Sequence, residues 1–349
     1  DFTKRMIFRG TSDGRFPEGN LVAQGGYFYG MTPEGGAEEQ GCIFRINQDG
    51  SGYTKLFDFD GSNGRKPKGS LLYHEGVFYG TASEGGDFDY GIVFRINTDG
   101  SGYSILHHFN SDADGGYPRD NLIVEDDILY GLTEYGGSGT PGSIFSLHTD
   151  GTGFATLHNF SNLTQGSSPK GSLVKSGNML YGLAEYGGSD SKGTIFSYDL
   201  NASDFTILHH FTGDDGSFPG GSLTLSGTKL YGMTSEGGDE NGGVLFSIET
   251  NGNNYSVIRH FDNTARGPQG SVILSEGILY GLTKYGGGND SGAAFSYDIA
   301  EDTFTVLGSF TGTNGTYPYG DPIRIGEDLY GMARDGGIIG LGNLFRYSS

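Results

Sequence analysis

Short apolar runs recur along the whole chain, and each is bounded by Gly, Asp or Pro. In the third copy of this pattern the runs lie at 121–124 (NLIV), 128–132 (ILYGL), 143–147 (SIFSL) and 154–157 (FATL). The apolar residues show no helical spacing, whereas short runs between turn residues are typical of β-strands. The pattern therefore predicts four strands in each copy.

The four runs occur seven times, and a Tyr-Gly pair marks the second run of every copy. Successive tyrosines of these pairs are 50, 51, 51, 50, 49 and 50 residues apart. They are Tyr29, Tyr79, Tyr130, Tyr181, Tyr231, Tyr280 and Tyr330. Four antiparallel strands in a repeat of about 50 residues are typical of a propeller blade. We therefore expect an all-β fold, a seven-bladed β-propeller of four-stranded antiparallel blades.

The two ends of the chain complement each other. Residues 1–10 (DFTKRMIFRG) align with residues 53–61, the end of a copy, whereas the last copy stops at residues 343–347 without its fourth strand. We expect residues 1–10 to complete the seventh blade, so that the N-terminal strand closes the ring and covers the open sheet edges. The repeat is unbroken, which predicts a single propeller domain over residues 1–349.

Repeated glycine and phenylalanine positions are expected in the core. A glycine such as Gly131 occupies the same place in every second strand, and we expect neighbouring blades to crowd there and to leave no room for a Cβ. The phenylalanines of the third and fourth strands, such as Phe145 and Phe160, are expected to fill the space between sheets. His107, His158 and His209 share one repeat position, and His108, His210 and His260 the next, which favours structural roles common to the blades.

Composition narrows the possible partners. The chain has 66 Gly, 22 Tyr, 24 Phe and no Trp, which is typical of a turn-rich β protein. The formal charge of −21 opposes binding to nucleic acid or to an anionic membrane surface. No apolar run reaches the roughly 18 residues of a membrane span, so we expect no direct membrane insertion. Cys42 is the one cysteine and cannot form an internal disulfide.

The run LHHFTGDDGSFPGGSL at 208–223, followed by LYGMTSEGG and GGVLFSI, resembles the Gloeo/Verruco (GloVer) tandem repeat of exported bacterial proteins. All seven copies keep the Tyr-Gly pair, the paired glycines and the late Phe. The resemblance implies export to the extracellular space or the bacterial cell surface, and a larger parent protein with an anchor. It implies no catalytic residues.

One face of the propeller is expected to carry the site. The loops between second and third strands and the loops between blades share a face, and they are long and variable, as at 137–142 and 110–119. The remaining loops, such as 125–127 and 149–151, are short. Binding residues concentrate on variable loops over a rigid frame, so we place the site on the loop-rich face.

Two sets of positions vary between copies on that face. The residue after the repeat's proline is expected near the mouth of the central channel. These residues are Glu18, Lys68, Arg119, Lys170, Gly220, Gln269 and Tyr319. The residue before the paired glycines forms the second set. These residues are Glu34, Glu84, Tyr135, Tyr186, Glu236, Tyr285 and Asp335.

Seven of these positions are our candidate ligand-binding residues. They are Lys68, Arg119, Lys170, Tyr135, Tyr186, Tyr285 and Tyr319. The three cations fall on consecutive blades and would hold a carboxylated or sulfated sugar by charge-assisted hydrogen bonds, while aromatic rings pack against its apolar face. The alternative is ordinary surface variation, in which the basic residues offset neighbouring acids.

Three functions follow as hypotheses. The first is an exported, non-enzymatic binding or adhesion propeller that recognises a carbohydrate or a cell-surface protein. The second is a lyase or glycosidase acting on an acidic (uronate or sulfated) polysaccharide. Lys68, Arg119 and Lys170 would neutralise a uronate while Tyr135 or Tyr186 moves the proton. The third is an architectural spacer.

We predict no cofactor and no metal site. The acidic interblade loops at 60–63, 112–114 and 214–215 offer oxygen ligands for calcium, which makes Ca²⁺ the lesser alternative. They lack the spaced pattern of a calcium loop, and Asp and Asn are common in turns, so structural turns are favoured.

Overall fold

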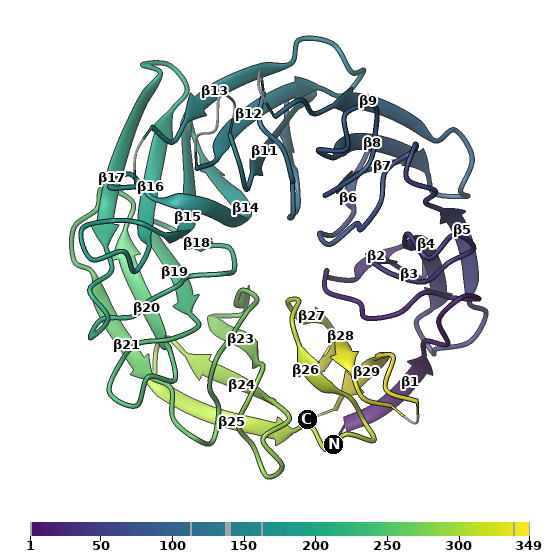
Figure 1. The fold of residues 1–349 in the computed structure, drawn as a ribbon. Coiled ribbons are helices and arrows are strands. Elements are labelled where there is room, and N and C mark those ends of the chain that lie inside the picture. The colour runs from purple at the N-terminus through teal and green to yellow at the C-terminus, as the bar shows by residue number, and fades with distance from the viewer. Residues whose placement is uncertain (1, 112–113, 137–140, 162, 338, 349) are drawn as a thin grey trace.

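The structure is a ring of seven antiparallel sheets around a central channel (Figure 1). It is a computed structural model that describes residues 2–111, 114–136, 141–161, 163–337 and 339–348. Those residues form strands, turns and irregular segments without a helix, and hence without a helix able to cross a membrane. The predicted all-β, seven-bladed propeller is confirmed.

The first four blades follow one another along the chain, and each has its first strand nearest the channel. Blade 1 comprises β2 (Val22–Gln24), β3 (Tyr27–Thr32), β4 (Cys42–Asn47) and β5 (Thr54–Asp58). Blade 2 comprises β6 (Leu72–His74), β7 (Val77–Ala82), β8 (Ile92–Asn97) and β9 (Ser104–His108). Blade 3 comprises β10 (Ile123–Glu125), β11 (Ile128–Thr133), β12 (Ser143–His148) and β13 (Ala155–Asn159). Blade 4 comprises β14 (Ser167–Ser176), β15 (Met179–Tyr186), β16 (Thr194–Asp199) and β17 (Asp204–His210).

The remaining three blades complete the ring. Blade 5 comprises β18 (Thr224–Ser226), β19 (Lys229–Thr234), β20 (Val244–Glu249) and β21 (Ser256–His260). Blade 6 comprises β22 (Ile273–Ser275), β23 (Ile278–Thr283), β24 (Ala293–Asp298) and β25 (Thr303–Ser309). Blade 7 comprises β26 (Thr316–Pro318), β27 (Ile323–Ile325), β28 (Asp328–Asp335), β29 (Asn343–Tyr347) and the N-terminal β1 (Phe2–Ile7).

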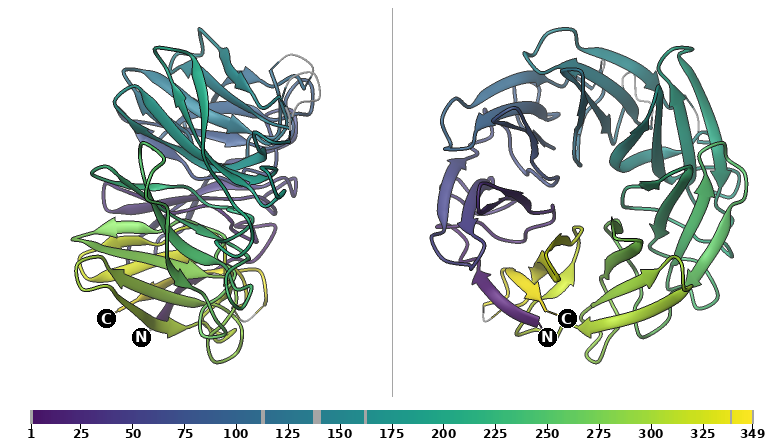
Figure 2. Two further views of the ribbon diagram at one scale, coloured as in Figure 1. Left: turned by 90° about the vertical axis from the view of Figure 1, so that its left-hand side faces the viewer. Right: turned by 180° about the vertical axis from the view of Figure 1, so that it is seen from behind.

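The ring is closed by β1, which pairs antiparallel with β29 from Phe2↔Tyr347 to Ile7↔Asn343. Both views of Figure 2 show the two chain ends side by side at this seam. The ring of Phe2 lies 4.5 Å from that of Phe310 in the preceding blade, and Phe8 lies 5.3 Å from Phe44 in the next. The N-terminal segment therefore joins blade 7 to both neighbours, as predicted.

The repeated glycine faces the phenylalanine of its own blade. Gly131 pairs with Phe145, and a Cβ at Gly131 would lie 2.5 Å from the Phe145 ring and 2.8 Å from Leu122. The six equivalent glycines face their own third-strand Phe in the same way. Steric exclusion of a Cβ is thus confirmed, but its predicted origin in neighbouring blades is wrong, because the crowding atoms belong to the same sheet.

The histidines tie the outer strands of the ring together. His107, His158 and His209 stack face to face on an aromatic ring of the next blade, with centroids 3.7 to 4.0 Å apart. The Nδ1 atoms of His108, His210 and His260 accept a backbone N–H from the loop between the second and third strands. The predicted structural role at both positions is confirmed.

Candidate functional site

The loop-rich face carries a cavity at the mouth of the channel. Consecutive strands of each blade are antiparallel, so the loops between second and third strands and the loops between blades emerge on this face. The cavity has a volume of about 140 Å³. Its wall includes all seven residues that follow the repeat's proline, namely Glu18, Lys68, Arg119, Lys170, Gly220, Gln269 and Tyr319.

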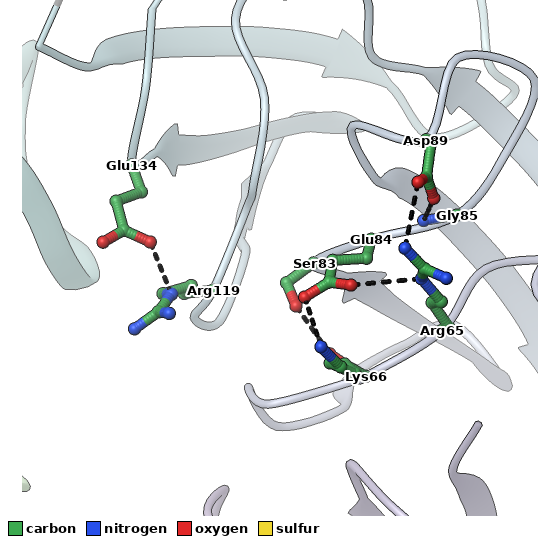
Figure 3. A network of polar contacts seen from close by, with 8 residues as sticks. All are labelled: Arg65, Lys66, Ser83, Glu84, Gly85, Asp89, Arg119 and Glu134. Atoms are coloured by element: carbon green, nitrogen blue, oxygen red, sulfur yellow. Dashed lines mark hydrogen bonds and ion pairs between the residues drawn. The ribbon is translucent and has the colours of Figure 1, made fainter. Parts of the chain in front are cut away.

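The cationic arc of the mouth is partly neutralised. Arg119 Nε lies 2.5 Å from Glu134 Oε2, and Lys170 pairs with Glu185 (Figure 3 draws the Arg119 pair). Glu134 and Glu185 precede Tyr135 and Tyr186, and neighbouring residues of a strand point to opposite sides. These two acids were not among the residues predicted from the sequence, because the position singled out there was the one immediately before the paired glycines.

Residues equivalent to Glu134 and Glu185 in other blades also contact residues of the cavity wall. Lys284 Nζ donates a hydrogen bond to the Tyr319 hydroxyl at 2.7 Å, and Arg334 Nε lies 3.2 Å from Glu18 Oε1. In blade 2 this position is Ser83, whose hydroxyl bonds the Lys66 carbonyl (Figure 3). The charge of the mouth therefore depends on two repeat positions, the residue after the proline and the residue two places before the paired glycines.

Lys68 differs from the other two cations of the arc. Within the described residues it has no ion pair, whereas Arg119 and Lys170 each have one. Burial lowers the pKa of the Lys68 ammonium, and the nearby charges of Arg119 and Lys66 act in the same direction. A partly buried ammonium without a counter-ion thus lies in the wall of the cavity.

The second predicted set does not line the cavity. Each of its residues pairs with the segment that precedes the repeat's proline, as Gly116 does with Tyr135 and Ser167 with Tyr186. Tyr135 and Tyr186 are 50% and 44% exposed, and Tyr285 lies under Arg266 and Lys284. Of the seven candidate residues, the structure therefore brings Lys68, Arg119, Lys170 and Tyr319 to the cavity and leaves the other three tyrosines outside it.

A belt of hydrogen bonds surrounds the channel just below the mouth. The residue three places after the repeat's proline takes part in every blade. These residues are Asn20, Ser70, Asn121, Ser172, Ser222, Ser271 and Asp321. Six of the seven backbone N–H groups donate to the side chain of the next blade, as in Asn20 to Ser70 at 2.5 Å and Asp321 to Asn20 at 2.6 Å.

The belt is interrupted between blades 3 and 4. The Asn121 N–H donates to Asp120 Oδ1 at 2.8 Å, and the buried Ser172 hydroxyl has no partner. Asp120 stands where the other six copies have glycine. Burial raises the pKa of the Asp120 carboxyl to about 6, and Asp321 across the channel adds to the shift. Asp120 was not among the predicted site residues, although its replacement of the repeat's glycine is visible in the sequence.

Replacing Asp120 with asparagine is expected to stabilise the protein at pH 8. The raised pKa means that the folded protein binds the proton more tightly than the unfolded chain, so this carboxyl lowers stability as pH rises from about 4 to about 6. Two pKa units correspond to at most about 3 kcal/mol, less where water reaches the carboxylate. Urea unfolding at pH 8 and pH 4.5 measures the change.

The gain from Asp120→Asn should shrink at pH 4.5, where the wild-type carboxyl is protonated in the fold. Asp150→Asn is the matched control, because hydrogen bonds from Thr152 lower the pKa of this exposed turn residue. It should bring no gain at pH 8. Equal stability of wild type and Asp120→Asn at both pH values would show that the carboxyl is fully solvated.

Exposed apolar side chains gather on the loop-rich face. Five large ones are exposed in the described residues, and all five belong to loops or strand ends of this face. They are Phe88 (51%), Tyr135 (50%), Leu163 (64%), Tyr186 (44%) and Ile339 (53%). The first four fall within blades 2 to 4, the blades that carry the cationic arc.

The acidic loops are built as turns. Asp60 Oδ1 accepts the Asn63 N–H and the Ser62 hydroxyl, and Asp215 Oδ1 accepts the Thr212 N–H. Residues 112–113 of the acidic loop at 112–114, and residues 137–140 of the variable loop at 137–142, lie outside the described residues. On the opposite face, ligand atoms of His74, Glu75 and Asp127 lie within 4.8 Å of one another.

Comparisons with known proteins agree with this architecture. A family model described as the Gloeobacter/Verrucomicrobia repeat matches residues 1–142 and 123–345. No curated protein matches significantly. A chain from the crystal structure of the nidogen/laminin complex is similar, with 16% identity, a TM-score of 0.51, and coverage of 80% of this chain and 94% of that one. TolB from Acinetobacter baumannii is 12% identical, with a TM-score of 0.47, and the match covers 82% of this chain and 61% of that one.

The fold and the mouth thus define a seven-bladed propeller with one elaborated, asymmetric face. The chain belongs to the Gloeobacter/Verrucomicrobia repeat family, and the family match extends over nearly all of its length.

Proposed function

We propose that this chain is a non-enzymatic binding propeller that recognises a surface protein through its loop-rich face, over blades 2 to 4. The observation that carries the proposal is that, in the part of the chain that the structure describes, all five exposed large apolar side chains lie on this face. Clusters of exposed apolar residues rimmed by polar ones mark interaction sites, and aromatic residues are enriched in the cores of protein interfaces.

A protein fits this surface better than a carbohydrate, the other ligand class that the sequence predicts. Phe88 and Leu163 offer apolar surface without a hydrogen-bonding group, whereas a sugar needs polar partners beside each aromatic platform. The mouth cavity of about 140 Å³ is also smaller than the roughly 300 Å³ at which small-molecule sites begin. The nidogen/laminin structure is a protein complex, but at 16% identity its similarity to this chain supports only the fold.

The lyase alternative receives less support from the geometry. Elimination needs a base beside the cation that neutralises the uronate, and among the described residues the cavity that holds the unpaired Lys68 is lined by neither Tyr135 nor Tyr186. Burial and the neighbouring Glu185 also raise the pKa of Tyr186. A tyrosine with a raised pKa is a weaker base catalyst at neutral pH, because less of it is ionised.

We further propose that the protein acts outside the cell as part of a larger anchored protein. The support is the resemblance of its repeats to those of exported bacterial proteins. Fractionation of the parent bacterium, with an antibody against this propeller, measures the location. Recovery only from the cytoplasm would contradict export.

The binding proposal predicts that apolar-to-polar changes on the loop-rich face weaken capture of the partner. Immobilised wild-type protein, Leu163→Ser and Tyr186→Ser are compared for binding of surface proteins from the parent bacterium, followed by affinity measurement with the purified partner. We expect each change to weaken binding at least about tenfold, as loss of a central apolar contact does.

Lys229→Ser is the matched control, because Lys229 is exposed on the face with short loops. Its affinity should equal that of the wild type. A glycan array and incubation with uronate polymers are run beside the capture. Binding of a glycan that Leu163→Ser leaves intact, or turnover of a polymer, would overturn the proposal.

A further inference from the structure

Lys68 is the residue of the cationic arc, which comprises Lys68, Arg119 and Lys170, that lacks a carboxylate partner among the described residues. Among the described residues of the cationic arc, Arg119 and Lys170 are held by Glu134 and Glu185, whereas no carboxylate pairs with Lys68. The chain carries 42 acidic and 21 basic residues. Within the part of the chain that the structure describes, Lys68 is therefore a cation without a carboxylate partner in the wall of this cavity, on a protein whose acids outnumber its bases.

The surroundings of Lys68 favour an incoming anion. The same wall holds three carboxyl groups, those of Glu18, Asp120 and Glu185. Arg334 engages Glu18 at 3.2 Å, and Lys170 engages Glu185.

Burial and the charges of Arg119 and Lys66 lower the pKa of the Lys68 ammonium, and the charges of Glu18 and Glu134 do not reverse this shift. Removing a charge from water without a counter-ion is costly, and Coulomb attraction is stronger where burial lowers the effective dielectric constant. A ligand anion that reaches the ammonium would relieve this cost.

The size of the cavity limits what can enter. Its volume of about 140 Å³ is enough for the tip of a side chain. Tyr319 and Gln269 form the wall opposite the arc, and both can hydrogen-bond a carboxylate oxygen. The exposed apolar residues of blades 2 to 4 lie outside the cavity on the same face. A polypeptide can cover those residues and extend one acidic group into the mouth at the same time.

We infer that Lys68 receives a carboxylate group of the partner polypeptide in the channel mouth, with Arg119 and Tyr319 beside it. This inference rests on the proposed function and adds the chemistry of the anchoring group. The carboxylate makes a charge-assisted hydrogen bond with the Lys68 ammonium, which is stronger than a neutral one.

The test uses the whole chain labelled with ¹³C-lysine and observes the Lys68 side-chain resonance by NMR. The resonance is assigned by its loss in Lys68→Arg. The probes are N-acetylglutamate N-methylamide, its glutamine counterpart and glucuronate. We expect the glutamate probe to shift Lys68 saturably and to bind at least about tenfold more tightly than the glutamine probe, a difference typical of one charge-assisted contact.

Lys192 is the internal control, since it lies on the same face outside the cavity, over the ring of Phe218. Its resonance should not move. Equal binding of the two amino-acid probes, or no shift at all, would overturn the inference. A shift with glucuronate and none with glutamate would overturn the assignment to a polypeptide. The capture experiment with Leu163→Ser does not involve Lys68, so the two proposals fail separately.

Discussion

Replacing Phe8 with alanine is expected to lower the free energy of unfolding by about 3–5 kcal/mol, the range for truncating a fully buried Phe. Phe8 is 0% exposed, and its backbone N–H donates to the Gly342 carbonyl at 3.1 Å. Its ring contacts Phe44 of blade 1, so it holds the seam between blades 7 and 1. Urea unfolding of the two proteins measures the loss.

Phe109→Ala is the control that distinguishes the effect of opening the seam from the general cost of creating a cavity in the core. Phe109 is equally buried at the corresponding place of blade 2, where the chain itself joins the fourth strand to the third strand of the same blade. Both variants should lose similar stability, but only Phe8→Ala should release the N-terminal segment to trypsin, which cleaves after Lys4 and Arg9. If Phe8→Ala unfolds at the wild-type midpoint, the ring does not depend on this closure.

Gly131→Ala is expected to destabilise the protein by about 1–3 kcal/mol, the usual cost of an extra methyl group in a packed core. The new Cβ would lie 2.5 Å from Phe145 and 2.8 Å from Leu122, so the ring or the strand must move. Adding Phe145→Leu removes the ring tip that collides. The double variant should therefore lose less unfolding free energy than the sum of the losses in the two single variants. Urea unfolding of the four proteins measures this coupling.

Gly288→Ala is the matched control for the added methyl group. A Cβ at Gly288 meets no atom within 4 Å, and this glycine does not have a positive φ. The change should alter stability by no more than about 0.5 kcal/mol, as most surface substitutions do. Additive effects of Gly131→Ala and Phe145→Leu would contradict the steric explanation.

The candidate site was only partly predictable. The position after the proline could be placed at the mouth because proline and glycine fix the backbone on either side in nearly every copy. Glu134 and Glu185 were missed because the sequence does not show which of two adjacent residues at a strand end points to the axis. Tyr135 and Tyr186 were assigned to the same site as the cations for that reason, although they lie outside the cavity.

The repeat by itself determined the number of blades, the four strands in each and the closing role of the N-terminal segment. Strand length, turn residues and the period of about 50 residues are local properties, and each copy of the repeat shows them in its own sequence. The pairing of charges at the mouth was decided only by the tertiary structure. Arg119 and Glu134 are brought together by the fold of one blade, and Lys68 stands apart because blade 2 has Ser83 where blades 3 and 4 have an acid. Such differences depend on how side chains from separate strands meet around a common axis.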